Sequence, residues 1–373
     1  MDDADEFDPG PPLETIGSVF AVYETRTDGE RLFYYGDPLV DPESMMRELW
    51  PAFRDAGYEA QFTRRHGEYV IVAEPTNTGI DGIPWTNVVL FLATVASTLF
   101  AGAMWYHIDP FAEPLEIWRA WPFSVAILLV LGVHEMGHYV MSRYHDVDAS
   151  LPYFLPVPTI IGTMGAVIKM KGRMPDRKAL FDIGVAGPLA GLVATVVVTV
   201  VGLHLPPVIA PAELANDPDA IRLQLGYPPL LELLAAAFDQ PLYRDDPTTS
   251  VNPVVIGGWV GMFVTFLNLI PVGQLDGGHI LRAMVGDRQE TVAALVPGVL
   301  FALAGYLYYV GGYDGNSVLI WVFWGFFATL IAAAGPAKPV VDDRLGAERI
   351  LLGIVTFVLG VLCFMPVPIE IVS

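Results

Sequence analysis

Cysteine and basic residues are both scarce in this sequence. A single cysteine, Cys363, occurs among 373 residues, so neither an intrachain disulfide nor a cysteine-based zinc site can be built. The 20 Lys and Arg residues stand against 41 Asp and Glu, which gives a net charge of −21. So acidic a surface argues against nucleic acid or anionic lipid as a partner. Lysine occurs only four times, and an acidic, lysine-poor surface indicates a protein that stays hydrated in high salt, hence a halophilic source.

A basic-then-apolar pattern is also lacking at the N-terminus, which begins "MDDADEFD", so no signal peptide is expected. From about residue 85 onward, apolar runs near 20 residues recur, long enough to cross a ~30 Å hydrocarbon core. The expected spans are 85–106, 120–143, 180–204, 253–271, 291–310, 317–335 and 348–367. The sequence therefore predicts a mainly α, polytopic transmembrane helical bundle of about six to seven spans in a lipid bilayer.

The residues before these runs predict a small soluble part. Residues 1–15 are expected to be a disordered acidic tail, and residues 16–82 a soluble α/β accessory domain of order ββαββ, before the transmembrane domain at 83–373. Asp41 and Pro42 mark a helix start, whereas Pro51 predicts a kink or an early end. The accessory domain holds no catalytic motif, so a regulatory or docking role and a plain structural role stay open.

Orientation follows from the distribution of basic residues. If residues 1–84 are cytosolic, loop 144–179, which carries five of the 20 Lys and Arg residues, is cytosolic too. The acidic loop 205–252 then lies outside. We expect a multi-pass protein of the cell membrane with a cytosolic N-terminal domain.

The strongest chemical signal is "HEMGH" at residues 134–138, inside the second expected span. Residues four apart share one helix face, so His134 and His138 can bind one ion, with Glu135 near enough to act as general base. Each such group costs about 2.5–3.5 kcal/mol in a spanning helix, which a bound cation would offset. The alternative is the polar interior of an ion or solute transporter.

A third ligand must come from far along the chain, because no Glu occurs between residues 139 and 212 and Tyr144 occupies the metzincin histidine position. The best candidate is Asp276, in "FLNLIPVGQLDGGHI" at the end of the fourth span. Pro271 and Gly273 break that helix at membrane depth. The alternative is an Asp-Gly turn at the membrane surface.

Together, HEMGH, the later Asn268-x-x-Pro271 and the Leu275-Asp276-Gly277 triplet resemble the site-2 protease family of intramembrane metalloproteases (peptidase M50). The stretch "PYFLPVPTIIGTMGAVIKMKGRMPDRKALFDIGVAGPLAG" is similar to its archaeal and plastid branch, related to the plant EGY proteins.

This resemblance implies that His134, His138 and Asp276 bind one Zn²⁺, that Glu135 activates water and that Asn268 assists near the transition state. It implies an endopeptidase that cleaves transmembrane segments of other membrane proteins. A transporter would predict paired segments in two halves, which the sequence lacks, and intact Glu135 argues against a catalytically silent scaffold. Substrate identity and oligomeric state are not indicated.

Two further stretches carry weaker signals. "GAVIKM" predicts an edge strand, which either holds an unwound substrate or belongs to a plain cytosolic hairpin. "AGPLAG" at residues 186–191 indicates close helix contact or a helix break.

Overall fold

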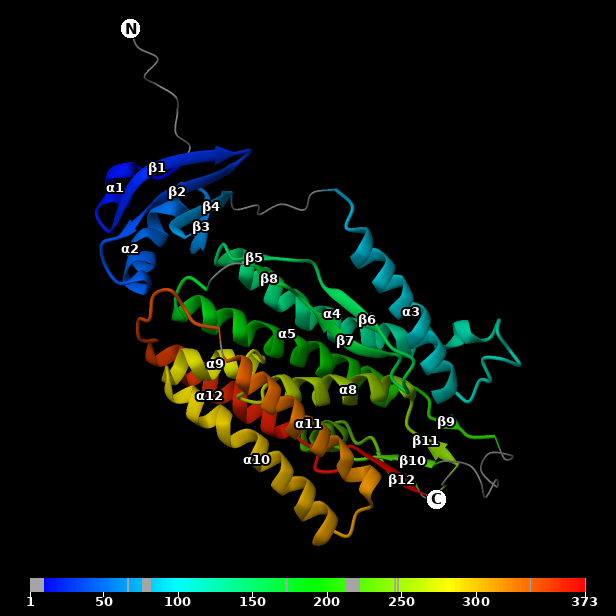
Figure 1. The fold of residues 1–373 in the computed structure, drawn as a ribbon. Helices are drawn as coiled ribbons and strands as arrows, with labels where there is room; N and C mark the ends of the chain where they lie inside the picture. Colours follow the sequence, from blue (N-terminus) through cyan, green and yellow to red (C-terminus); the bar gives the residue numbers. More distant parts are fainter. Residues whose placement is uncertain are drawn as a thin grey trace.

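The computed structural model describes residues 10–65, 67–75, 82–171, 174–211, 222–244, 246, 248–335 and 337–372. The described chain is mainly helical, and a small antiparallel sheet near the N-terminus sits at one end of a long helical bundle (Figure 1). The C-terminus lies at the other end of the bundle.

The N-terminal unit is a four-stranded antiparallel sheet with a helix packed against it. Its elements are α1 (Leu13–Gly17), β1 (Phe20–Asp28), β2 (Arg31–Pro38), α2 (Pro42–Asp55), β3 (Tyr58–Arg65) and β4 (Glu68–Pro75), in sheet order β1-β2-β4-β3. Met45, Leu49 and Phe53 recur every four residues and are fully buried against the sheet. The unit therefore has its own hydrophobic core.

Two details of this unit differ from expectation. Helix α1 begins at Leu13, inside the stretch expected to be disordered, because Ile16 is buried in the core; residues 1–9 lie outside the described part of the chain. Pro51 does not end α2, which continues to Asp55. Buried Leu49 and Phe53 hold the helix on both sides of the proline.

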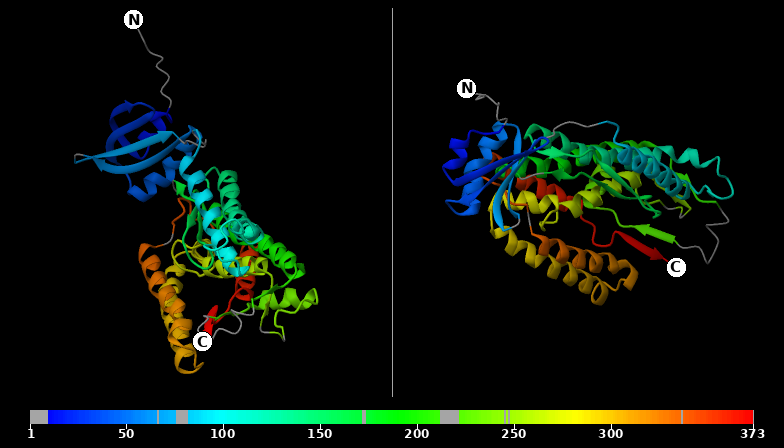
Figure 2. Two further views of the ribbon diagram at one scale, coloured as in Figure 1. Left: turned by 90° about the vertical axis from the view of Figure 1, so that its right-hand side faces the viewer. Right: turned by 45° about the horizontal axis from the view of Figure 1, so that its top comes forward.

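Five helices of the described chain are long and apolar enough to cross a membrane. They are α3 (Trp85–Trp105), α4 (Trp121–Tyr144, extended by the short 3-10 helix Ile117–Ala120), α5 (Arg177–His204), α10 (Arg288–Tyr309) and α11 (Gly315–Ala334). Of the most apolar stretch of α5, 61% is buried, against 28% for α3 and 22% for α10. Helix α5 is therefore central, and α3 and the α10–α11 pair lie on opposite sides of the bundle (Figure 2).

Two of the seven expected spans form shorter helices. Helices α8 (Pro253–Asn268) and α12 (Ala347–Leu362) have 16 residues each, or roughly 24 Å at 1.5 Å per residue. Helix α8 is enclosed by other helices along most of its length, so it does not have to match the thickness of the lipid. It ends at Asn268, before Pro271, and α9 (Asp276–Val285) follows after a short irregular turn.

The middle of segment 144–179 forms short strands and is not an irregular loop. It contains β5 (Asp148–Ala149), β6 (Tyr153–Pro156), β7 (Thr163–Val167) and β8 (Met170–Lys171), with β6 paired to β7 and β5 to β8. Asn87, near the start of α3, donates to the carbonyls of Leu151 and Pro152 at 2.9 Å. Trp105, at the other end of α3, donates to the Ile160 carbonyl at 2.8 Å.

The hairpin of β6 and β7 therefore runs along nearly the whole of α3 (Figure 1), roughly 27 Å for 18 helical residues. This part of the segment therefore packs against α3 and is not a free loop, and its cytosolic side stays a prediction. Polar side chains of α3 satisfy backbone groups of the hairpin, as Ser97 does for the Gly162 carbonyl at 2.5 Å. Irregular backbone can lie at membrane depth only when such groups find partners within the protein.

Segments beyond α5 complete the end of the bundle that lies away from the N-terminal unit. They are β9 (Val208–Ile209), β10 (Arg222–Leu225), α7 (Pro229–Ala237), β11 (Thr249–Ser250) and β12 (Ile369–Val372). Strand β12 pairs with β10, and β11 pairs with β9, both antiparallel. The C-terminus is thereby tied to the segment that precedes α7.

Candidate metal centre

The two histidines of HEMGH lie one turn apart on the face of α4 that meets α5 and α8. Both are buried, His134 at 3% and His138 at 6% exposure. Their Nε2 atoms are 3.3 Å apart. The i, i+4 spacing alone brings both nitrogens to one point.

Asp276 reaches the same point from more than 130 residues away. It is the first residue of α9, and its Oδ2 lies 3.3 Å from His134 Nε2 and 3.2 Å from His138 Nε2. The turn before it is tight: Gly273 has φ +48°, and a Cβ on Gly277 would overlap with the Leu269 carbonyl. The glycines around Asp276 therefore let α9 begin directly beside α4.

These three side chains fit a divalent ion. Three atoms at mutual distances of 3.2–3.3 Å have a common centre about 1.9 Å from each. Zinc binds nitrogen and oxygen ligands at about 2.0–2.2 Å, so tetrahedral ligands lie about 3.3 Å apart. Within the described residues, His134, His138 and Asp276 form the one cluster able to hold a metal ion. Two imidazoles and a carboxylate are also a donor set typical of catalytic zinc.

The outer nitrogen of His138 has a partner of its own. His138 Nδ1 lies 2.8 Å from the Ile183 carbonyl of α5. A carbonyl accepts, so Nδ1 carries the proton and the Nε2 lone pair remains available to a metal. Ile183 thus fixes both the tautomer and the orientation of the ring.

Glu135 and Asn268 lie next to this cluster. Glu135 is 7% exposed, and the backbone of Ile168, just after β7, interacts with its carboxyl group. The Asn268 amide nitrogen lies 3.1 Å from His134 Nε2. The structure therefore gathers all five residues that the sequence singled out, and it places the β7 segment beside Glu135.

Two glycines were not recognised as part of the site from the sequence. A Cβ on Gly187 would overlap with the imidazole ring of His138, and a Cβ on Gly191 would lie 2.9 Å from His134 Cβ and Nδ1. Helix α5 continues unbroken through "AGPLAG", so of the two expectations only close helix contact applies. The four-residue spacing of the glycines, equal to that of the histidines, was the available signal.

Comparison with known proteins agrees with this geometry. Residues 122–305, which include every residue of the cluster, match the model of peptidase family M50. The chain carries a peptidase family M50 domain. This domain runs from the start of α4 into α10, so the N-terminal sheet lies outside it.

Relatives of the M50 domain extend the similarity. The chain is 31% identical over 327 residues to the probable zinc metalloprotease EGY1, chloroplastic, of Arabidopsis thaliana, covering 79% of this chain and 55% of that protein. It is 33% identical over 260 residues to EGY1 of Oryza sativa subsp. japonica (69% and 42%) and 29% identical over 254 residues to EGY2 of Arabidopsis thaliana (66% and 42%). The chain thus spans about half the length of these relatives. No solved structure matches it.

Proposed function

We propose that this chain is a zinc-dependent intramembrane endopeptidase that cleaves transmembrane segments of other membrane proteins. The observation that carries the proposal is the triangle of His134, His138 and Asp276, with Glu135 beside it, inside a bundle of apolar helices. The M50 domain and its zinc metalloprotease relatives support it. A transporter and a silent scaffold are not favoured, because the chain keeps both the ligand set and the general base.

In this proposal each residue has a separate task. His134, His138 and Asp276 hold zinc, which when bound makes water nucleophilic near neutral pH and polarises the scissile carbonyl. The Glu135 carboxylate would accept a proton from the attacking water and pass it to the leaving amine. Asn268, beside His134, offers an amide N–H to the oxygen on which negative charge develops.

The position of the β6–β7 hairpin supports a mode of substrate binding. A helical segment hides its own amides, so it must unwind before hydrolysis. Among the described strands β7 pairs only with β6, and its continuation at Ile168 lies at Glu135. A locally extended substrate could add to the open edge of β7 by backbone hydrogen bonds, and this position favours substrate binding over a plain hairpin.

Cleavage by the purified chain tests the proposal. The chain in detergent is incubated with a panel of single-span fusion proteins whose spans contain Gly and Pro, with and without a zinc chelator. We expect cleavage within a span, loss of cleavage on chelation and recovery on adding Zn²⁺. Zinc-free protein that still cleaves, or zinc-loaded protein that cleaves no member of the panel, would count against the proposed function.

We also propose that the protein lies in the cell membrane with its N-terminal unit in the cytosol. The basic residues that flank β8 and the start of α5 support this orientation. Single cysteines at positions 170 and 230, introduced into a Cys363→Ala chain, test it in intact cells. An impermeant reagent is expected to label position 230 and not position 170, and the reverse pattern would invert the topology.

A further inference from the structure

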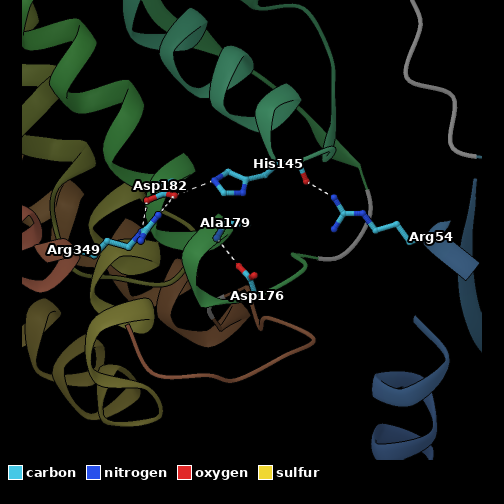
Figure 3. A network of polar contacts seen from close by, with 6 residues as sticks. All are labelled: Arg54, His145, Asp176, Ala179, Asp182 and Arg349. Carbon is cyan, nitrogen blue, oxygen red and sulfur yellow. Dashed lines mark hydrogen bonds and ion pairs between the residues drawn. The ribbon is translucent and has the colours of Figure 1, made fainter. Parts of the chain in front are cut away.

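One charged contact ties together three helices next to the metal centre. Asp182, in the second turn of α5, accepts two hydrogen bonds from Arg349 of α12, at 2.8 Å to Oδ1 and 2.9 Å to Oδ2. Its Oδ2 also lies 3.0 Å from Nε2 of His145, directly after α4 (Figure 3). The Asp182 side chain is 15% exposed. A paired, largely buried carboxylate with two partners fixes their geometry more firmly than a surface ion pair does.

The residue after Asp182 contacts the metal centre. The backbone carbonyl of Ile183 accepts a hydrogen bond from His138 Nδ1–H at 2.8 Å. His138 and His145 are seven residues apart, two helical turns, so both lie on the face of α4 that meets α5. Helices α4 and α5 are thus joined at two successive points, one at Asp182 and one at Ile183.

The same corner receives the N-terminal unit. Arg54 at the end of α2 donates to the His145 carbonyl at 2.8 Å (Figure 3). Arg54 also pairs with Asp146 at 3.0 Å. Helix α4 ends at Tyr144, where the backbone has no further helical turn to hold it. The position of this helix end therefore depends on contacts such as that between His145 and Asp182.

We propose that Asp182 is a positioning residue for the metal centre. By holding His145 and Arg349, Asp182 keeps α4 and α12 in place against α5. The His138 ring then stays where its Nδ1–H donates a hydrogen bond to the Ile183 carbonyl. Loss of this contact lets α4 shift along α5, which turns His138 Nε2 away from the metal. Outer partners of metal-bound histidines typically contribute 10–100-fold to metal affinity. The inference rests on the proposed function only in taking His138 as a zinc ligand.

The test uses the full chain in detergent and two readouts that do not need a substrate. Zinc affinity is measured by competition with a chelator, and the visible absorption spectrum of the Co²⁺-substituted protein reports ligand geometry. The variants are Asp182→Ala and Asp182→Asn. The matched control is Asp176→Ala, which removes the N-cap of the same helix, a hydrogen bond from the Ala179 N–H at 2.7 Å (Figure 3).

We expect Asp182→Ala to bind zinc about 10–100-fold more weakly and to alter the Co²⁺ spectrum. Asp182→Asn keeps the size and one acceptor oxygen, so it should show a smaller loss in the same direction. Asp176→Ala should lower the melting temperature while its zinc affinity stays within about twofold of the parent. A purely structural role of Asp182 would instead lower the melting temperature and leave zinc affinity and spectrum unchanged.

Unchanged zinc affinity in both Asp182 variants would overturn the positioning role and leave the proposed function standing. If Asp182→Ala does not fold, Asp182→Asn decides by the same criterion. A parent chain that binds no zinc would overturn the proposed function and this inference together. A parent that binds zinc but cleaves nothing would count only against the function.

Discussion

Replacing Gly187 by alanine adds one methyl group where α5 passes the ring of His138. A Cβ at this position would overlap with Nε2, Cδ2 and Cε1 of the imidazole. The ring cannot easily yield, because its Nδ1 is held by the Ile183 carbonyl and its backbone lies inside α4, more than one turn before the helix ends at Tyr144. Overpacking of a tight interior by one methyl group costs about 1–3 kcal/mol.

That cost should appear in metal binding. If it is relieved by moving His138 off the metal, zinc affinity falls by about 5–150-fold, because about 1.4 kcal/mol corresponds to a factor of ten. Gly191→Ala should have a milder effect, since its Cβ would approach His134 to 2.9 Å rather than overlap with a ring. Gly298→Ala in α10 is the control, because a Cβ there meets nothing within 4 Å.

Zinc affinity of the three purified alanine variants is measured by chelator competition. The expected order of loss is Gly187, then Gly191, with Gly298 equal to the parent. Gly187→Ala with zinc affinity within twofold of the parent would refute the argument that α5 shapes the site through this glycine. Equal losses in all three variants would mean that added methyl groups destabilise the bundle in general.

Three further predictions concern other parts of the chain. Asn268→Ala should keep zinc and lower turnover less than Glu135→Gln does. Zinc content and cleavage rate, measured on the same preparation, check this. Loss of zinc would show instead that Asn268 holds His134 in position for the metal. A chain that begins at Ile80 should still bind zinc, because the ligands lie on α4 and α9, and a zinc-free truncated protein that folds would contradict this. The ion pair with Arg177 lowers the pKa of Asp342 below its ordinary value of 3.8, so the pair stabilises the fold above that pH and this contribution is lost as pH falls through the lowered value. Asp342→Asn should accordingly lower the melting temperature at pH 7, and the difference from the parent should shrink at pH 3; a difference that grows on acidification would reverse the sign.

The parts of the site that sequence could predict are those fixed by local geometry. HEMGH needs only the helical period to bring His134 and His138 together. Asp276 could be proposed because Pro271 and Gly273 interrupt an apolar helix at matching depth. The distances between the three side chains depend on how α4 and α9 both pack against α5, and no local pattern encodes them.

Long-range packing accounts for what the sequence did not predict. The run 253–271 is largely apolar, yet α8 ends at Asn268, before Pro271, and is shorter than a span. The bundle accepts this short helix because the helices around it bury most of its length. The packing of the β6–β7 hairpin along α3 was not predicted, because Asn87 and Trp105, which satisfy its backbone, are distant in sequence. The contact of Asp182 with His145 and Arg349 likewise joins three separate helices.

The central claim is that Asp276 completes a zinc site at which Glu135 moves a proton. Zinc content and cleavage rate of Asp276→Ala and Glu135→Gln, purified side by side, test it most directly. Asp276→Ala should lose zinc, because one of three protein ligands is removed. Glu135→Gln keeps all three ligands, so it should retain zinc while turnover falls by about 10²–10⁴-fold or more. Full zinc occupancy in Asp276→Ala, or near-normal cleavage by Glu135→Gln, would contradict the account.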